Sequence, residues 1–259
     1  NTISRVHLIE NATSGSQNII IKQGTGATVT IEPGHVKMVY LDGAGSGAAV
    51  TDALTQLNLK GPISTTTAGT SNFVAGVNAG NSITSGGNYN VAVGDEAGTA
   101  LTTGDYNTAL GFEALAATTD RNSNTAIGAQ TLKTNVNGAK NTAVGSGALF
   151  TMNPSTDAET FNTAIGFDAG NDITTGIKNV LLGSRVGDAL DEGTNNIAIG
   201  DSALSSDTKG NKSVAIGDSA LFNQNFTTST TSFNTAVGFE AGNSINTGQS
   251  NTLIGYEAG

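Results

Sequence analysis

The chain has 259 residues, including 35 glycines and no cysteine or tryptophan, and only 12% of its residues are charged and 5% aromatic. This composition excludes disulfides and thiolate metal sites and lacks the side chains of a bulky core, so it indicates a repetitive or fibrous protein that buries small residues in a regular backbone lattice. The net charge of −10 opposes nucleic acid and anionic membranes as partners, and no apolar run approaches the roughly 20 residues of a membrane-spanning helix.

Residues 1–46 are predicted to form a small antiparallel β module. Four strand-length runs rich in Val and Ile are separated by Gly, Ser, Asn and Pro, and they read RVHLIE, NIIIKQ, ATVTIE and HVKMVYLD. Pro33 and Gly34 stand where a type II turn places them. This turn predicts that Ile31 and Val36 lie in a hairpin.

Residues 47–60 are predicted to form a short amphipathic helix, because their apolar residues have helical spacing. The apolar stripe consists of Val50, Ala53, Leu54 and Leu57. The polar segment that follows, residues 61–71, is typical of a linker.

From residue 72 to residue 259 one motif, Asn-x-Ala-(Val/Ile/Leu)-Gly, recurs eleven times. Its first position is held by Asn72, Asn90, Asn107, Asn124, Asn141, Asn162, Asn179, Asn196, Ser213, Asn234 and Asn251. The successive intervals are 18, 17, 17, 17, 21, 17, 17, 17, 21 and 17 residues. A base period of 17 therefore carries a four-residue insertion at every fourth step, which makes a larger repeat of 72 residues.

A unit of 17 residues is too short to fold alone, because ordering it costs about 1.5 kcal/mol per residue. Its stability must come from stacking on its neighbours. Thr125 and Ile127 alternate with Asn124 and Ala126, as in a strand, and Gly128 then supplies a turn before a second, shorter strand. We therefore predict an all-β chain whose main part is a parallel β-roll, a β-solenoid of about eleven 17-residue coils. We also expect the array to continue beyond residue 259, since the sequence stops in mid-pattern.

The recurring Asn is interpreted as a structural ladder rather than a row of ligand-binding amides. In such a ladder each side chain bonds to the next coil, about 4.8 Å away, and the replacement Ser213 also forms hydrogen bonds. The ladder comprises Asn90, Asn107, Asn124, Asn141, Asn162, Asn179, Asn196, Asn234 and Asn251. The Ala at the third motif position, changed only to Leu181 and Leu253 within the regular coils, suggests a close-packed face against which other solenoids press.

The motifs NTAIG, NVAVG, NIAIG and SVAIG resemble the head repeats of trimeric autotransporter adhesins of the YadA type, whose head is a left-handed parallel β-roll formed by three chains. Similar repeats occur in bacteriophage tail fibres and spikes. The N-terminal run KMVYLDGAGSGAAVTDAL is similar to small β modules of phage tail fibres, which favours a phage protein. The resemblance covers residues 72–259 and implies a homotrimer.

No catalytic, metal or cofactor site is expected. His7 and His35 alternate with apolar neighbours and are interpreted as solvent-facing strand residues. Five acids share one repeat position beside the second Ala of each coil, and they are Glu96, Glu113, Asp168, Glu240 and Glu257. A solvated acidic stripe explains them more simply than the paired carboxylates of a glycoside hydrolase.

Exposed aromatic residues are the candidates for recognition of a partner, although the simpler interpretation, that they cover one another where the insertions bulge, is favoured. The position after the motif Gly accepts either Asp or an aromatic residue, so it is exposed, and exposed aromatic rings can stack on sugars. The candidate receptor contacts are Phe112, Phe167, Phe239 and Tyr256 at this position, and Phe161 and Phe233 at the ends of the insertions.

We expect a structural and receptor-binding segment of a trimeric bacteriophage tail fibre, located in the virion. Its expected partners are two further copies of the chain, other tail proteins, and a host cell-surface glycan or protein. The alternatives are the head of a bacterial trimeric adhesin at the cell surface and a polysaccharide-degrading spike that uses an acid such as Asp168.

Ice binding by a row of Thr side chains is a further alternative. It would need a flat exposed face, and strand alternation places these Thr on the same side as Ile and Val, which argues against it. The row includes Thr108, Thr125, Thr142 and Thr163.

Overall fold

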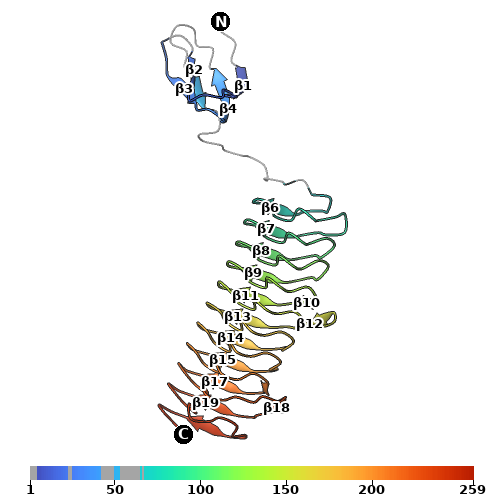
Figure 1. The fold of residues 1–259 in the computed structure, drawn as a ribbon, viewed down its shortest axis with the longest axis vertical. Helices are drawn as coiled ribbons and strands as arrows, with labels where there is room; N and C mark the ends of the chain where they lie inside the picture. Colours follow the sequence, from blue (N-terminus) through green and yellow to red (C-terminus); the bar gives the residue numbers. More distant parts are fainter. Residues whose placement is uncertain (1–4, 23–24, 42–49, 53–64, 66) are drawn as a thin grey trace. The chain divides into compact units, whose positions relative to one another are not determined.

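The computed structural model divides the chain into two units, residues 1–63 and 64–259 (Figure 1). The described residues are 5–22, 25–41, 50–52, 65 and 67–259. They form β-strands and turns, and this part of the chain contains no helix. The predicted all-β class is therefore confirmed for the described residues.

The first unit is a small antiparallel β module. Its strands are β1 (Arg5–Glu10), β2 (Ile19–Lys22), β3 (Thr28–Ile31), β4 (Val36–Leu41) and β5 (Val50–Asp52). β4 pairs with β1 on one side and β5 on the other, and β2 and β3 form a separate pair. Val29, Ile31, Val39 and Val50 form its buried core. The four predicted strands are thus present.

The predicted hairpin between Ile31 and Val36 is wrong, although the turn between them is present. Gly34 has a φ of 78°, as the third residue of a type II turn requires. Ile31 nevertheless pairs with β2, and Val36 pairs with β1. The buried Asn11 keeps the two strands apart, because its side-chain amide donates to the Ile31 carbonyl at 2.8 Å and its backbone carbonyl accepts from the Gly34 N–H at 2.8 Å.

The helix predicted over residues 47–60 lies mostly outside the described residues. Its described part, Val50–Asp52, is strand β5, so the helix prediction is wrong there. Val50 is buried in the module, and its β-branched side chain suits a strand. Residues 61–64 and 66 of the predicted linker also lie outside the described part of the chain.

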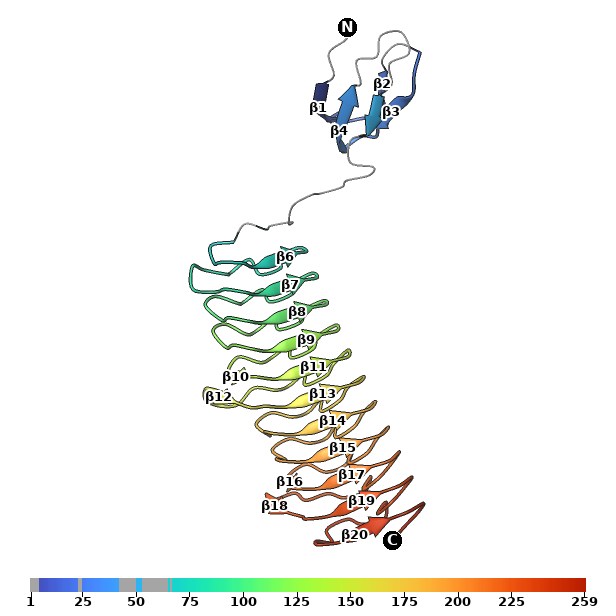
Figure 2. The ribbon, with the colours of Figure 1, turned by 180° about the vertical axis from the view of Figure 1, so that it is seen from behind.

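The second unit is a parallel β-solenoid of eleven coils, as the repeat predicts (Figures 1 and 2). Each coil contributes one three-residue strand to a single sheet. The strands are β6 (Phe73–Ala75), β7 (Val91–Val93), β8 (Thr108–Leu110), β9 (Thr125–Ile127), β11 (Thr142–Val144), β13 (Thr163–Ile165), β14 (Val180–Leu182), β15 (Ile197–Ile199), β17 (Val214–Ile216), β19 (Thr235–Val237) and β20 (Thr252–Ile254). Equivalent motif positions pair throughout, so that Ala126, for example, lies beside Ala143.

The two insertions add short parallel pairs at the edge of the solenoid. β10 (Gly138–Ala139) pairs with β12 (Ala158–Glu159), and β16 (Gly210–Asn211) pairs with β18 (Thr230–Thr231). Each pair joins the end of an insertion to the coil before it. The inserted residues are therefore held by backbone hydrogen bonds.

The predicted second strand of each coil is a turn. The residue four places after the strand-ending Gly has a left-handed backbone, with φ of 52° at Leu115 and 55° at Gly98. Such a residue cannot continue a strand. Gly at this position in five of the ten complete coils is a signal of this conformation, whereas the Leu in the other five is not, since Leu rarely adopts it.

The interior of the solenoid is made mainly of Ala methyl groups. The strand Ala and the second Ala of each coil are almost all fully buried in one hydrophobic cluster of this single chain. The prediction that the Ala face meets other solenoids is therefore wrong. The strand and the turn opposite it approach so closely that mostly methyl-sized side chains fit between them.

Each complete coil also places a large apolar side chain in the interior at one of two positions. Leu181, Met152 and Gln224 are further large buried side chains. Five coils use the left-handed position, with Leu115, Leu132, Leu149, Leu204 and Leu221. In the other five this position is Gly, and the residue three places later fills the space, as Ile83, Leu101, Ile173, Leu190 or Ile245. In coils without an insertion the two choices exclude each other, because a Cβ on Gly98 would lie 2.8 Å from Leu101 Cδ1. The two coils with insertions have room for both positions, since Leu149 and Met152 are fully buried together, as are Leu221 and Gln224.

This exclusion predicts compensation between two substitutions in one coil. Gly98→Leu should overpack the interior and lower the free energy of unfolding by about 1–3 kcal/mol, and Leu101→Thr should leave a cavity that costs about 2–4 kcal/mol. The double variant copies the next coil, which has Leu115 and Thr118, and should be more stable than either single variant. Urea unfolding of the three variants measures this. Additive losses would show that the two side chains do not share one space.

The strand-ending glycines allow the coils to approach. From Gly76 to Gly238 these glycines have φ between 126° and 144°, and an added Cβ would lie 2.0–2.6 Å from backbone atoms of the next such glycine. Only glycine fits both constraints.

Gly183→Ala should therefore destabilise the solenoid by about 3 kcal/mol or more, because its Cβ would lie 2.3 Å from the Gly200 carbonyl oxygen. Gly255→Ala is the matched control, since Gly255 has a φ of 130° but nothing within 4 Å. It should cost only the backbone strain, about 1–2 kcal/mol. Thermal and urea unfolding compare the two, and equal losses would contradict the role of close coil contact.

Candidate interaction surfaces

The ladder residues connect each coil to the next through buried hydrogen bonds. Asn124 is typical: its Oδ1 accepts the backbone N–H of Asn141 at 3.1 Å, and its Nδ2 donates to the Gly138 carbonyl at 3.0 Å. The bonds thus run mainly between side chain and backbone, and amide-to-amide contacts occur at only a few steps, such as Asn179 to Asn162 at 3.2 Å. These side chains satisfy backbone groups that the short strands leave unpaired.

Ser213, the exception in the ladder, is compensated by a neighbouring Gln. Gln224 is fully buried, and its Nε2 donates to Ser213 Oγ at 2.8 Å and to Asp207 Oδ2 at 2.6 Å. Its Oε1 accepts from Asn234 Nδ2 at 2.7 Å. Burial raises the pKa of Asp207, although backbone N–H groups and Gln224 hydrogen-bond to its carboxylate.

The equivalent buried positions 72 residues earlier are occupied by different residues. Asn135, Asn141 and Met152 stand there in place of Asp207, Ser213 and Gln224. Asn141 carries the ladder bond itself, and Met152 fills the space of the Gln. The two blocks therefore offer interchangeable buried sets.

Gln224→Met alone should lower the free energy of unfolding by about 2–4 kcal/mol, because it removes the partner of the buried Asp207 Oδ2 and leaves Ser213 Oγ with Ser232 Oγ alone. Adding Asp207→Asn and Ser213→Asn copies the first block and should restore most of the loss. Urea unfolding of the single and triple variants measures the difference. A triple variant as unstable as the single one would refute the compensation.

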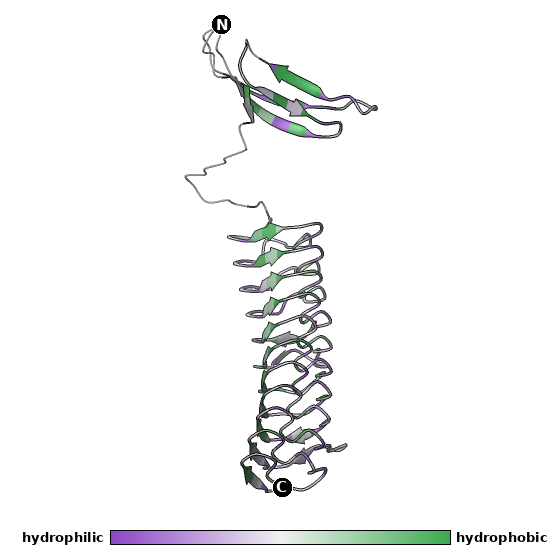
Figure 3. Cartoon of the chain, turned by 90° about the vertical axis from the view of Figure 1, so that its left-hand side faces the viewer, coloured by the Kyte–Doolittle hydropathy of each residue, from purple (hydrophilic) through white to green (hydrophobic). Residues whose placement is uncertain are grey.

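The outward side of the solenoid sheet is apolar. Alternation points the first and third residues of each strand away from the interior, and these are Thr, Val, Ile or Leu in most coils. They are half-buried or exposed in the single chain. We call these residues of β6 to β20 the outer face, and Figure 3 shows its strands as a hydrophobic column.

Two rows of residues flank the outer face. The leading row is the residue before each ladder position, and the trailing row is the residue after each strand-ending Gly. All exposed large hydrophobic residues described between 65 and 259 belong to the outer face or these rows. They are Phe73, Val77, Tyr89, Val91, Tyr106, Leu110, Phe112, Phe161, Ile165, Phe167, Val180, Leu182, Ile197, Phe233, Phe239, Ile254 and Tyr256. The exposed apolar surface of the solenoid is thus one band along its length.

The six predicted receptor contacts all lie in the flanking rows and are 44–72% exposed. The trailing row holds Phe112, Phe167, Phe239 and Tyr256, and the leading row holds Phe161 and Phe233. The rings of the last two trailing residues stack, with centroids 5.6 Å apart.

The favoured interpretation, that the insertion aromatics cover one another, is wrong. Phe161 lies under the ammonium of Lys140, and Phe233 lies under that of Lys212, each 5.3 Å from the ring centroid. In each insertion coil the three-residue strand lies between the leading-row Phe and the trailing-row Phe. The leading-row Phe therefore packs against a Lys of the preceding coil and not against another aromatic ring.

Two aromatic residues of the leading row were missed in the sequence. Tyr89 and Tyr106 stack with centroids 5.0 Å apart and an interplanar angle of 8°. Each directly precedes a ladder Asn, as Phe161 and Phe233 do. The shared coil position was the signal that could have found them.

The acidic residues of the shared repeat position all have left-handed backbones, with φ between 47° and 58°. They form local contacts along the solenoid. Glu113 accepts hydrogen bonds from Gln130 and Lys133, which lower its pKa, and Glu96 accepts from Asn78 at 2.6 Å. These contacts connect neighbouring coils.

The two histidines, His7 and His35, are exposed in the N-terminal unit, as the sequence predicts.

A second acidic group lines a shallow hollow of about 240 Å³ that includes Asp168, Asp172 and Asp188. Burial raises the pKa of Asp172, and the neighbouring carboxylates add to this shift. Among the described residues, no group of three or more His, Cys, Asp or Glu is arranged to hold a metal ion.

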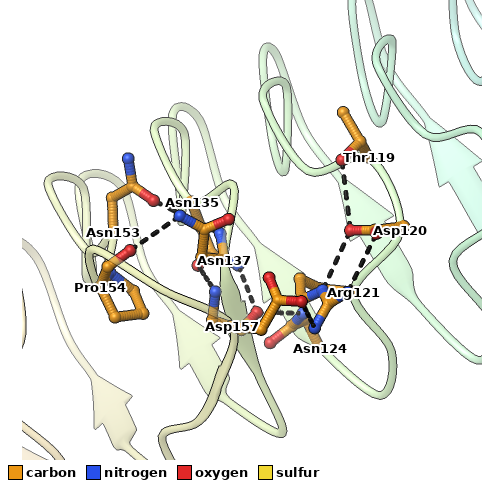
Figure 4. A network of polar contacts seen from close by, with 10 residues as sticks. Thr119, Asp120, Arg121, Asn124, Asn135, Asn137, Asn153, Pro154 and Asp157 are labelled. Carbon is orange, nitrogen blue, oxygen red and sulfur yellow. Dashed lines mark hydrogen bonds and ion pairs between the residues drawn. The ribbon is translucent and has the colours of Figure 1, made fainter.

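A more elaborate hollow lies at the first insertion (Figure 4). Arg121 lies between two carboxylates, with nitrogen to oxygen distances of 3.0 Å to Asp120 and 3.1 Å to Asp157. Lys140 pairs with Glu159 at 2.5 Å on the same wall. The insertion thus brings together charged residues from three successive coils.

Comparison with protein-family models, with curated protein sequences and with solved structures finds no match to this chain. Within the described residues, no helix is long and apolar enough to cross a bilayer.

Proposed function

We propose that this chain is a structural and receptor-binding segment of a homotrimeric bacteriophage tail fibre, with the outer faces of three copies packed together. The observation that carries the proposal is the continuous apolar band along one side of the solenoid. Soluble monomers rarely expose apolar patches larger than a few hundred Å². Parallel sheets, moreover, are normally covered on both faces.

Self-association suits this band better than an unrelated partner. The band repeats once per coil, about every 4.8 Å, so a second copy in parallel register presents the same residues at every level. Rotation about an axis along the solenoid gives each copy the same environment and closes the assembly. The resemblance of the motifs to trimeric head repeats favours three copies.

A fibre role follows from the proposed assembly. Three solenoids joined along their length make a rod with a backbone hydrogen-bonded from coil to coil, which suits transmission of force between a tail and a host surface. The aromatic rows at the edges of the outer face remain the surfaces for attachment. A bacterial adhesin head would use the same assembly and is the alternative.

The trimer is tested by mass in solution. Light scattering should give three times 25.9 kDa for the purified chain. Val180→Glu with Leu182→Glu should shift the mass toward the monomer, because these two outward side chains are 42% and 44% exposed in the single chain and would place charges in the contact.

The matched control is Ser244→Glu with Asn246→Glu, which has the same two-residue spacing at exposed positions outside the band. The control should remain trimeric. A folded, cooperative monomer of the original chain would contradict the proposal, as would an equal effect of both pairs.

Ice binding is a second candidate, favoured by one observation. The outer face places Thr at corresponding outward positions of successive coils, and these side chains are half-buried in the single chain. They include Thr108, Thr125, Thr142 and Thr163. The earlier argument against this function is wrong, because the side shared by Thr, Ile and Val points outward. This function needs an uncovered face, so thermal hysteresis from a monomeric chain would support it and a trimer without hysteresis would exclude it.

A further inference from the structure

We infer that the hollow at the first insertion is a binding site for a neutral sugar ring of an oligosaccharide. Its volume is about 230 Å³, and its charged lining consists of Asp120, Arg121, Lys140, Asp157 and Glu159. The inference rests on the proposed attachment function for its biological role. Its physical basis is independent of the trimer.

The walls of the site are fixed in place. Asn153 Oδ1 accepts the backbone N–H groups of Val136 and Asn137, and Asn137 Nδ2 donates to the Pro154 carbonyl at 2.8 Å (Figure 4). The pairing of β10 with β12 then holds the residues that carry Asp157 and Glu159 against the preceding coil. A preformed site loses little entropy when a ligand binds.

The polar groups of the site suit hydroxyl groups. The hydrogen bond from Arg121 lowers the pKa of Asp120, so this carboxylate stays ionised. Carboxylates accept several hydrogen bonds and a guanidinium donates up to five, so both retain capacity beyond their ion pairs. Sugar hydroxyls donate and accept at once, and adjacent hydroxyls can bridge an acceptor and a donor. The Arg121 side chain is only 21% exposed and thus forms the floor rather than a mobile surface arm.

An aromatic ring stands at the edge of the hollow rather than in its lining. The ring of Phe161, which is 45% exposed, lies under the ammonium of Lys140, a lining residue, at 5.3 Å. The ring face that Lys140 leaves uncovered can stack on the apolar C–H face of a pyranose. The combination of a polar floor and one aromatic platform matches the two sides of a sugar.

Charge and size narrow the ligand class. Three carboxylates face two cations, so the lining has a net charge of −1, which disfavours acidic sugars. The hollow is smaller than the roughly 300–1,000 Å³ of sites for drug-sized molecules, which suits one ring. The ligand class is therefore a neutral hexose or N-acetylhexosamine unit.

The second insertion supplies a natural comparison. It keeps the Lys212 and Phe233 pair with the same 5.3 Å separation, yet Gly193, Ser229 and Thr231 stand in place of Arg121, Asp157 and Glu159. The aromatic and cationic pair is thus common to both insertions. The polar floor belongs to the first one only.

The test is binding of the 259-residue chain to an array of neutral oligosaccharides built from glucose, galactose, mannose and their N-acetylated forms, followed by calorimetry with the best glycan. Arg121→Gly with Asp157→Ser copies the second insertion, and Phe161→Ala removes the platform. Each should weaken binding by about tenfold or more, whereas Phe233→Ala should change it less than about twofold.

Light scattering and circular dichroism verify that every variant keeps the mass and fold of the original chain. The inference is overturned if no neutral glycan on the array binds, if the Arg121 and Asp157 variant binds normally, or if Phe233→Ala is as damaging as Phe161→Ala. If the chain is monomeric and binds a neutral glycan, the sugar site is supported and the trimeric fibre function is contradicted. If the chain is trimeric and binds no neutral glycan, the sugar site is contradicted and the trimer is supported.

Discussion

The close, in-register stacking of one coil on the next is the constraint on which the rest of the structure depends. Gly at the end of every strand lets the backbones approach, because any side chain there would collide with the next coil. The buried Asn ladder then satisfies the backbone groups that strands of three residues leave unpaired. Each coil must therefore match its neighbours at both positions, which explains why the sequence repeats so strictly.

The same stacking decides where the apolar surface lies. The interior accepts Ala and only one or two large residues per complete coil, so most Val, Ile and Thr of the strands point outward. A chain that cannot bury its larger apolar residues internally must cover them by association or expose them. The fibre proposal thus arises from the narrow interior. The flanking aromatic rows and the insertion hollow lie at the edges of the band, and such positions suit contacts with other molecules.

Periodicity allowed much of the fold to be predicted. The coil count, strand positions and ladder residues follow from counting, and Ser213 was correctly expected to be a hydrogen-bonding substitute. The orientation of the strands could not be derived, because both Ala and Ile are apolar and only the coil thickness decides which is inside. The left-handed Leu residues give no local signal. The insertion site was also missed, since Arg121 and Asp157 are 36 residues apart and only the stacked coils bring them together. Tyr89 and Tyr106 could have been found from their shared position.

In the proposed assembly the outer face is covered by other copies of the chain. Because the chain has no cysteine, a single introduced thiol reports on one position. Ile165→Cys places it on the outer face, where the side chain is 38% exposed in the single chain, and Thr175→Cys places it in the same coil at an exposed position outside the band. The measurement is the rate of maleimide modification of each thiol in the native protein. We expect slow modification at position 165 and fast modification at position 175, with both fast after unfolding. Equally fast modification of both thiols in the native protein would show that the outer face is uncovered.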